Sequence, residues 1–234
     1  MEYLFRNNLE SVHFNYFSPE HLYILLFIVV FLYFVPILTK NLLPHAYMVE
    51  KVIAFIFIGD LILNQLFFIW IGRYDVNLHL PIGIGRIVTY LFIIILLFKQ
   101  YHLFNIAFSW GIISCVGSFI FPDMGQFNFP HFTNISSIIY HCLIIYTLLY
   151  LAEVRKFKIN EYALKDNLIA CTLYFSIILV INLICKTNYG YLIKSTLDFI
   201  YISGPVYTTS FIALFIGLTT LISTQFMPNR KRGC

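Results

Sequence analysis

Apolar residues fill most of the chain in seven long runs, which are separated by shorter polar connections. The runs lie near residues 21–39, 49–71, 80–98, 102–121, 133–152, 166–186 and 204–226. A helix needs about 20 apolar residues to cross the hydrocarbon core of a bilayer, and each run is close to that length. The pattern predicts an all-α, polytopic transmembrane bundle of seven helices that forms a single domain over residues 1–234.

The two ends of the chain are more polar than the runs between them. Residues 1–20 mix charged and aromatic side chains, so we expect an interfacial lead-in on the membrane surface. Ser18, Pro19 and Glu20 predict the start of the first helix, with a serine N-cap, a proline at the first helical position and an acid in the first turn. Residues 227–234 form a short basic tail.

Composition supports the membrane prediction. Hydrophobic residues make up 60% of the chain, charged residues make up 11%, and the mean hydropathy is +0.82. A soluble domain of this size is far less apolar. No basic region and no small-residue cleavage site accompany the first run, so we expect a true span and no cleavable signal peptide.

The basic residues indicate the orientation of the bundle. Among the connections and ends of the chain, ten Lys and Arg residues fall on one side of the predicted membrane and four on the other. Lys and Arg are enriched in cytoplasmic loops, so the N-terminus is expected outside and the C-terminus in the cytoplasm. The net charge of +4 is explained by this bias, and no nucleic acid is expected as a partner.

One arginine lies inside the third run. Arg86 is about 9 Å from the outer end of a helix that begins at residue 80. A guanidinium keeps its proton, so it needs a carboxylate, a polar cavity or water, and charged residues at such depths mark functional sites by default. Asp60, about 16 Å down the second run, is the acid expected to pair with it.

Other polar side chains gather in the same outer half of the bundle. Asn64 is four residues after Asp60 and lies on the same helical stripe. Asn134, Ser137 and His141 form a second stripe, and Asn182 lies near the outer end of the sixth run. Such a pattern suits a polar pocket that opens outward or sideways into the outer lipid layer.

Each of these features also has a purely structural interpretation. Asp60 and Arg86 could form a buried ion pair with no ligand. His141 and its stripe could serve as hydrogen-bonding contacts between helices. Gly83 and Gly85 favour close helix packing over a ligand loop.

The five cysteines indicate neither a metal site nor a cofactor. They form no Cys-x-x-Cys pair and no spacing typical of metal ligands. Four of them lie in or beside apolar runs, where a thiol is usually a small hydrophobic group. We therefore expect no metal and no cofactor.

Several short motifs occur in an order that resembles a known family. They are Phe17-Ser-Pro-Glu-His-Leu22, Leu80-Pro-Ile-Gly-Ile-Gly85, Phe129-Pro-His-Phe132 before His141, Asn188-Tyr-Gly-Tyr-Leu192 and Gly204-Pro-Val-Tyr207. Together they resemble the YwaF-like family of bacterial seven-span membrane proteins, which looks distantly related to a eukaryotic transmembrane phospholipid acyltransferase family. The resemblance implies a multi-pass protein of the bacterial plasma membrane that has membrane lipids as partners.

The resemblance also implies acyl chemistry with a membrane cysteine and a histidine. His141 matches the histidine of the family. In the third run the family pattern reads Leu-Pro-Leu-His-Leu-Cys, and this chain has Gly83 at the histidine position and Gly85 at the cysteine position, followed by Arg86. Acyl transfer through a thioester needs a nucleophile beside a base, so this chain departs from the family pattern where the chemistry would begin.

Two kinds of function are consistent with these residues. The first is a lipid-interacting, acyltransferase-like protein, which as an enzyme would be a phospholipid acyl transferase or hydrolase. Its general base would be His141 or His21, and its substrate-binding residues would be Arg86, Asn64, Asn182 and Asp60. A degenerate form would bind lipid without chemistry. The alternative is a binding or transport component for a small amphipathic or anionic solute.

Overall fold

The described residues are mainly helical, with non-helical connections between the helices. The computed structural model describes residues 4–6, 15–39, 41, 43–123, 125–127, 129–195, 197 and 199–227. Its long helices are α1 (Pro19–Thr39), α2 (Ala46–Trp70), α4 (Ile84–Phe98), α5 (Phe104–Ile120), α6 (Phe132–Leu149), α7 (Ala163–Cys185) and α8 (Gly204–Phe226). Short helical turns are η1 (Leu43–His45), α3 (Val76–His79), η2 (Tyr101–Leu103), the π-turn η3 (Tyr150–Val154) and η4 (Tyr189–Tyr191). Residues 228–234 of the basic tail and most of the lead-in 1–20 lie outside the described residues.

Five helical segments are long and apolar enough to cross a membrane. They are Leu43–Trp70, Tyr101–Ile120, Phe132–Val154, Ala163–Cys185 and Gly204–Phe226. Two further apolar helices are shorter among the residues described, namely Pro19–Phe34 within α1 and Ile84–Phe98, which is α4. The all-α, multi-pass prediction is therefore confirmed, and the count of seven spans stays a prediction.

The predicted start of the first helix is confirmed. Helix α1 begins at Pro19, and the Ser18 hydroxyl accepts a hydrogen bond from the His21 backbone N–H at 3.4 Å. That bond satisfies one of the amide donors that the first turn of a helix leaves without an intrahelical partner.

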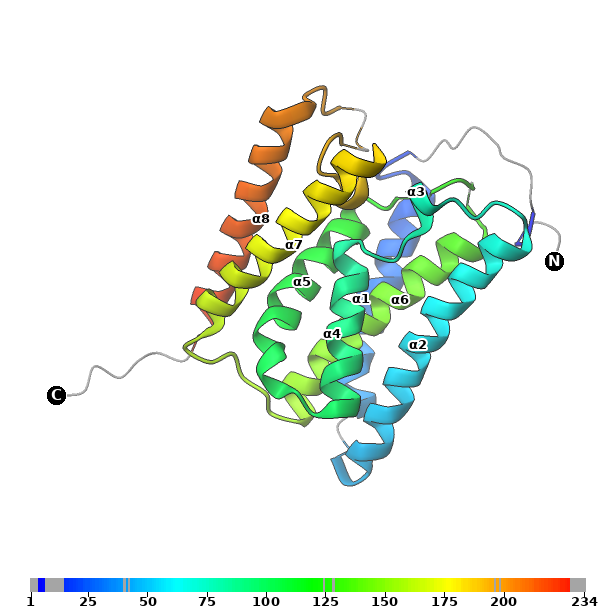
Figure 1. The fold of residues 1–234 in the computed structure, drawn as a ribbon. Coiled ribbons are helices and arrows are strands. Elements are labelled where there is room, and N and C mark those ends of the chain that lie inside the picture. Colours follow the sequence, from blue (N-terminus) through cyan, green and yellow to red (C-terminus); the bar gives the residue numbers. More distant parts are fainter. Residues whose placement is uncertain are drawn as a thin grey trace.

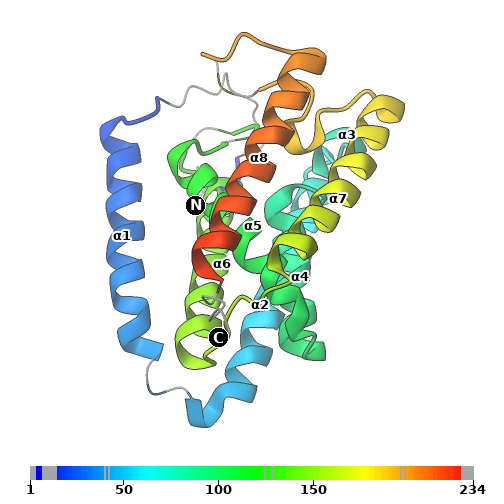
Figure 2. The ribbon, with the colours of Figure 1, turned by 90° about the vertical axis from the view of Figure 1, so that its left-hand side faces the viewer.

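Helix α5 lies at the centre of the bundle. It contacts α4, α6, α7 and α8, while α2 packs on α4 and α6 (Figure 1). Trp110 of α5 is 1% exposed and meets the rings of Tyr174 in α7 and Phe215 in α8 edge-on. Helix α1 packs on α6 and the η3 turn and stands at the edge of the bundle (Figure 2). The core is thus built around α5, and α1 is peripheral.

Helix α4 begins four residues later than the apolar run suggested. Residues 80–83 are not helical, and α4 starts at Ile84 with Gly83 as its N-cap. Asp75 is the N-cap of the short helix α3, which precedes this stretch; its carboxylate accepts a hydrogen bond from the Asn77 N–H at 2.8 Å. Arg86 is therefore the third residue of α4, in its first turn, and the expected position well inside a helix was wrong.

Tyrosine hydroxyls hold the non-helical stretch before α4. Tyr90 donates to the Pro81 carbonyl and Tyr174 donates to the Ile82 carbonyl, both at 3.1 Å, while Tyr189 accepts from the Leu80 N–H at 3.1 Å. Backbone groups at membrane depth must find partners within the protein, because lipid offers none. These hydroxyls make the late helix start possible.

The short α4 runs beside the middle of α2. At one end the Gln65 side chain of α2 donates to the His79 carbonyl at 3.0 Å, just before α4, and at the other end Lys99 pairs with Glu50 of α2. Fifteen residues of helix span about 22 Å, and the same number of residues separates Glu50 from Gln65. The first turn of α4 thus lies beside Gln65 and not beside the end of α2, and this position brings Arg86 to the level of polar side chains on α2.

His131 ties the N-terminal segment to the start of α6. Its Nδ1 accepts from the Thr133 N–H at 3.3 Å as the N-cap of α6, and its Nε2 donates to the Arg6 carbonyl at 3.2 Å. The imidazole is fully buried and stacks on Phe127, with 4.0 Å between the ring centroids. Burial lowers the pKa of His131; the hydrogen bond to the Arg6 carbonyl raises it, and the positive charge of Arg6 lowers it further.

These contacts predict that the folded protein loses stability at acidic pH. The capping role needs a lone pair on Nδ1, and the folded-state pKa lies below the unfolded value of 6.5. The stabilisation from His131 is therefore fully present above about pH 6.5 and is lost as the pH falls toward the lower folded pKa. Unfolding in detergent, followed against pH, should show this loss. The matched control is His131→Asn, which can still cap a helix but does not titrate. Equal pH dependence in the two proteins would contradict the assignment.

Candidate functional site

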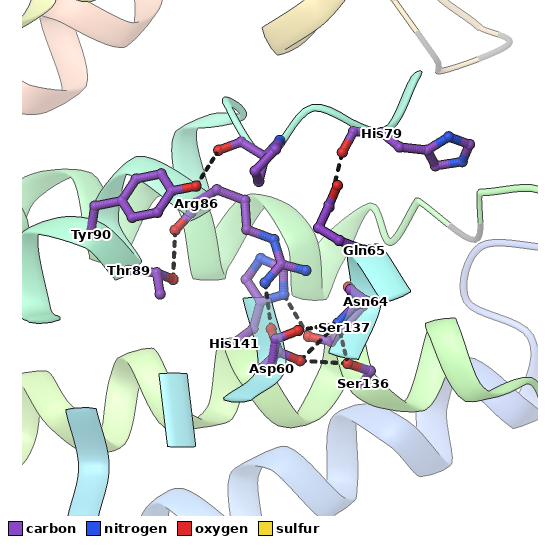
Figure 3. A network of polar contacts seen from close by, with 12 residues as sticks. Asp60, Asn64, Gln65, His79, Arg86, Thr89, Tyr90, Ser136, Ser137 and His141 are labelled. Atoms are coloured by element: carbon purple, nitrogen blue, oxygen red, sulfur yellow. Dashed lines mark hydrogen bonds and ion pairs between the residues drawn. The ribbon is translucent and has the colours of Figure 1, made fainter. Parts of the chain in front are cut away.

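A partly buried polar cluster joins α2, α4 and α6 in the C-terminal half of α2. Arg86 forms an ion pair with Asp60, and the other carboxylate oxygen of Asp60 accepts from Ser136 at 2.6 Å and from the Asn64 amide at 3.0 Å (Figure 3). The Asn64 amide also lies 2.9 Å from the Ser136 hydroxyl. We call Asp60, Asn64, Arg86 and Ser136 the Asp60 cluster. The predicted pairing of Asp60 with Arg86 and the shared stripe of Asp60 with Asn64 are confirmed.

The guanidinium of Arg86 has donors left over after it pairs with Asp60. Its side chain is 20% exposed, and Asp60 is the acceptor found for it among the described residues. A guanidinium carries five N–H donors in a planar fork that matches carboxylate and phosphate oxygens. It also lies over the ring of Tyr140, 4.3 Å from the centroid. The head of Arg86 is thus held on two sides while part of it stays accessible.

His141 lies next to this cluster with one ring nitrogen engaged. Its Nδ1 is 2.8 Å from the Ser137 carbonyl oxygen. A carbonyl can only accept, so Nδ1 carries the proton and Nε2 keeps its lone pair. The side chain is 6% exposed, and the charges of both Arg86 and Asp60 are close enough to act on it (Figure 3). Nε2 is therefore available as a proton acceptor beside a cation.

The space that a side chain at position 85 would take is occupied in this protein. A Cβ atom added to Gly85 would lie 2.2 Å from the Tyr140 hydroxyl oxygen and 2.9 Å from Ser114 Oγ. Real Cβ atoms do not approach other atoms so closely. A Cβ at Gly83 would meet nothing within 4 Å. A side chain at position 85 would therefore force Tyr140 and Ser114 to shift, whereas position 83 is open.

The cysteines close to His141 in the fold are directed away from its ring. Cys115 of α5 is fully buried, and its thiol lies 3.4 Å from the backbone carbonyl of His141. Cys142 follows His141 on α6 and so points about 100° away around the helix. Among the described residues, neither thiol hydrogen-bonds to the imidazole. Thiol activation by His141 has no geometric basis in this arrangement.

His21, predicted as a second candidate base, joins α1 to α5. Its Nδ1 accepts from the Phe17 N–H at 2.9 Å, and its Nε2 donates to the Phe119 carbonyl at 2.8 Å. The ring is fully buried. Both nitrogens hold backbone groups, which suits an anchor for α1. The ring of Phe119 also meets His141, with 6.0 Å between the centroids, so both histidines contact Phe119.

Asn182, predicted to bind substrate, organises the connection between α7 and α8. Its amide donates to the Tyr189 carbonyl at 2.9 Å, and its oxygen accepts from the Thr187 hydroxyl at 2.8 Å and the Tyr189 N–H at 2.7 Å. The side chain is 3% exposed. Its contacts are with this connection and not with the Asp60 cluster, so a role in substrate binding stays a prediction without geometric support.

A second buried acid was missed by the sequence pattern. Glu50, 1% exposed, lies in the second turn of α2 and pairs with Lys99 after α4 and with Arg155 after α6. It was not singled out because it stands near the polar end of its apolar run, where acids are common. The sequence feature that could have pointed to Glu50 is its position as an acid in a connection where Lys and Arg otherwise dominate. The described residues contain no group of three or more His, Cys, Asp and Glu that could hold a metal ion.

The fold and the polar interior together define a multi-pass helical membrane protein with a partly buried ion pair. A family model matches residues 16–223, and the chain belongs to the TMEM164 family. No curated protein and no solved structure matches the chain. The narrower resemblance to YwaF-like bacterial proteins and to phospholipid acyltransferases stays a prediction.

Proposed function

We propose that this protein binds a phospholipid through the Asp60 cluster, with Arg86 on the phosphate of the headgroup. The proposal rests on one observation above the others: a partly exposed guanidinium is fixed by Asp60 and Tyr140 and still has free donors. A phosphate can accept two parallel N–H bonds from such a fork. The apolar helix surfaces around the bundle suit the acyl chains.

The proposed topology has seven spans, with the N-terminus outside and the C-terminus in the cytoplasm. Helices α1 and α4 would complete the five longer spans, since both run alongside them (Figure 1). The non-helical residues 80–83 extend the path of α4 toward the surface. The Asp60 cluster would then lie in the outer half of the membrane, facing lipids of the outer leaflet. A bacterial plasma membrane remains part of this proposal.

As an enzyme, the protein would be a phospholipid acyl transferase or hydrolase that works without a thiol. Nε2 of His141 would take the proton of a lipid hydroxyl or a water, whose oxygen attacks the ester carbonyl carbon. The tetrahedral intermediate would then break its bond to the glycerol oxygen, which takes the proton back from the imidazolium. The packing of Tyr140 against Gly85 favours this direct route over a thioester.

The test compares phospholipid acyl profiles of cells without the protein, with the wild type, and with His141→Ala. We expect the wild type to shift the profile and His141→Ala to return it to that of cells without the protein. The matched control is His102→Ala, an exposed histidine after α4, which should behave like the wild type. An unchanged profile in all of these cells would exclude catalysis and leave lipid binding.

Lipid binding is tested separately with Arg86→Gln, which keeps the length and polarity of the side chain but removes its charge. Purified wild type should retain phospholipid, and the variant should retain less while remaining folded. The alternative function, binding or transport of a small amphipathic or anionic solute, uses the same guanidinium. A tightly bound solute of that kind in the purified protein, with no phospholipid, would favour it.

A further inference from the structure

The end of the bundle away from the Asp60 cluster contains a pre-arranged set of cations. Glu50 is 1% exposed, and its carboxylate pairs with Lys99 and, at 2.8 Å, with Nε of Arg155. Lys99 also donates to the Leu96 carbonyl at 2.8 Å. The side chains of Lys99 and Arg155 are 30% and 27% exposed, so a buried acid fixes two cations that still reach the surface.

A tyrosine extends this set along the start of α2. Tyr47 is 62% exposed, and its ring lies 4.3 Å from Nζ of Lys51 and 5.1 Å from Nζ of Lys99. Two ammonium groups on one ring repel each other. Cation–π attraction holds both ammonium groups at the ring, Glu50 also holds Lys99, and a nearby anion would offset the repulsion between the two charges.

The charges at this end do not balance. Lys99 and Arg155 share the single carboxylate of Glu50, and Lys51 lies on the Tyr47 ring beside Lys99, so these three cations and one acid carry a net charge of +2. The nearby Glu153 does not offset it, because Glu153 pairs with Lys156. The start of α2 and the ends of α4 and α6 meet here (Figure 1), so the excess positive charge comes from three separate helices.

We infer that Lys51, Lys99 and Arg155 bind the phosphate of an acidic phospholipid in the leaflet at this end of the bundle. The apolar side chains beside the cations favour an amphiphile over a soluble phosphate: Leu43, Met48 and Val52 are 54%, 68% and 48% exposed. Basic pockets between membrane helices bind anionic headgroups in this way. This site is independent of the Asp60 cluster and of the function proposed for it.

The experiment uses the full chain in nanodiscs of phosphatidylcholine mixed with phosphatidylglycerol, followed by detergent extraction and native mass spectrometry of the retained lipid. Wild type should retain phosphatidylglycerol in preference to phosphatidylcholine. Lys51→Gln should weaken this preference about fivefold, the effect expected of one basic residue near an anionic headgroup. Lys186 is an exposed lysine at the C-terminal end of α7, and Lys186→Gln should leave the preference for phosphatidylglycerol unchanged. Equal retention of the two lipids by wild type, or equal loss in both variants, would overturn the inference.

Glu50→Gln separates a built site from general attraction to positive charge. It raises the net charge of this end by one while removing the group that positions Lys99 and Arg155. A built site predicts weaker retention of phosphatidylglycerol, and simple charge attraction predicts stronger retention. If Glu50→Gln does not fold, Lys51→Gln and Tyr47→Leu decide the question, since both positions are exposed. In the last arm, thermal unfolding of the protein in detergent is compared with added inorganic phosphate and with added phosphatidylglycerol. Equal stabilisation by the two would overturn the assignment to a lipid.

Discussion

Asp60→Ala is expected to destabilise the protein by about 3–5 kcal/mol, the usual result of removing one partner of a buried ion pair. The variant leaves the Arg86 guanidinium without its carboxylate, in a part of the bundle where side chains of the pair are only 20% and 15% exposed. Ser136 and Asn64 lose their shared acceptor at the same time. Thermal or denaturant unfolding in detergent measures the loss.

A double variant shows whether the loss comes from the unpaired charge. Asp60→Ala with Arg86→Leu removes both charges, so much of the lost stability should return, because buried ion pairs replaced by apolar groups are often neutral. The matched control is the exposed pair Glu153 and Lys156, 64% and 74% exposed, for which Glu153→Ala should cost at most about 1 kcal/mol. If Asp60→Ala were no worse than Glu153→Ala, the guanidinium would have to be solvated, and the cluster would be open to water.

Gly85→Ala is expected to destabilise the protein by about 1–3 kcal/mol, as overpacking of a tight interior does. The new methyl group would fall 2.2 Å from the Tyr140 hydroxyl oxygen, and the ring of Tyr140 is itself held between Arg86 and His141. Tyr140→Phe removes the hydroxyl, so the nearest atoms to the new methyl group would be Ser114 Oγ at 2.9 Å and the Tyr140 ring carbon at 3.3 Å. The double variant should therefore recover part of the stability.

Gly83→Ala is the control for this series. Position 83 has open space around it and an extended backbone, so alanine there should change stability little. A loss as large as that of Gly85→Ala would point to the helix start itself and not to Tyr140. If Gly85→Ala is tolerated, Tyr140 can move, and position 85 can accept a side chain.

Much of the architecture could be predicted from local features of the sequence. Long apolar runs imply membrane helices because backbone amides in lipid must be satisfied within the segment. Ser18 and Pro19 marked the start of α1 because capping is a local interaction. The pairing of Asp60 with Arg86 was also within reach, since an intramembrane charge needs an opposite one and few acids stand at that depth.

The remaining features depend on contacts between distant parts of the chain. The apolar run at 80–98 could not reveal that α4 starts at Ile84, because hydroxyls of Tyr90, Tyr174 and Tyr189 hold the residues before it. The bond from His21 to Phe119 joins residues 98 positions apart, and that from Lys99 to Glu50 joins residues 49 positions apart. Helix periodicity fixes which residues share a face, but it does not fix which face meets which neighbour.

The third apolar run, near residues 80–98, shows most clearly what the sequence determines and what the tertiary structure adds. The sequence by itself determined that a cation, Arg86, lies inside an apolar run of a multi-pass membrane protein and that Gly83 and Gly85 come just before it. Only the tertiary structure decided that Tyr140 of α6 packs against Gly85 and that Nε2 of His141 remains available beside Arg86. The physical reason is that side-chain volume and hydrogen-bond geometry are settled where three helices meet, and none of the three apolar runs specifies that meeting alone.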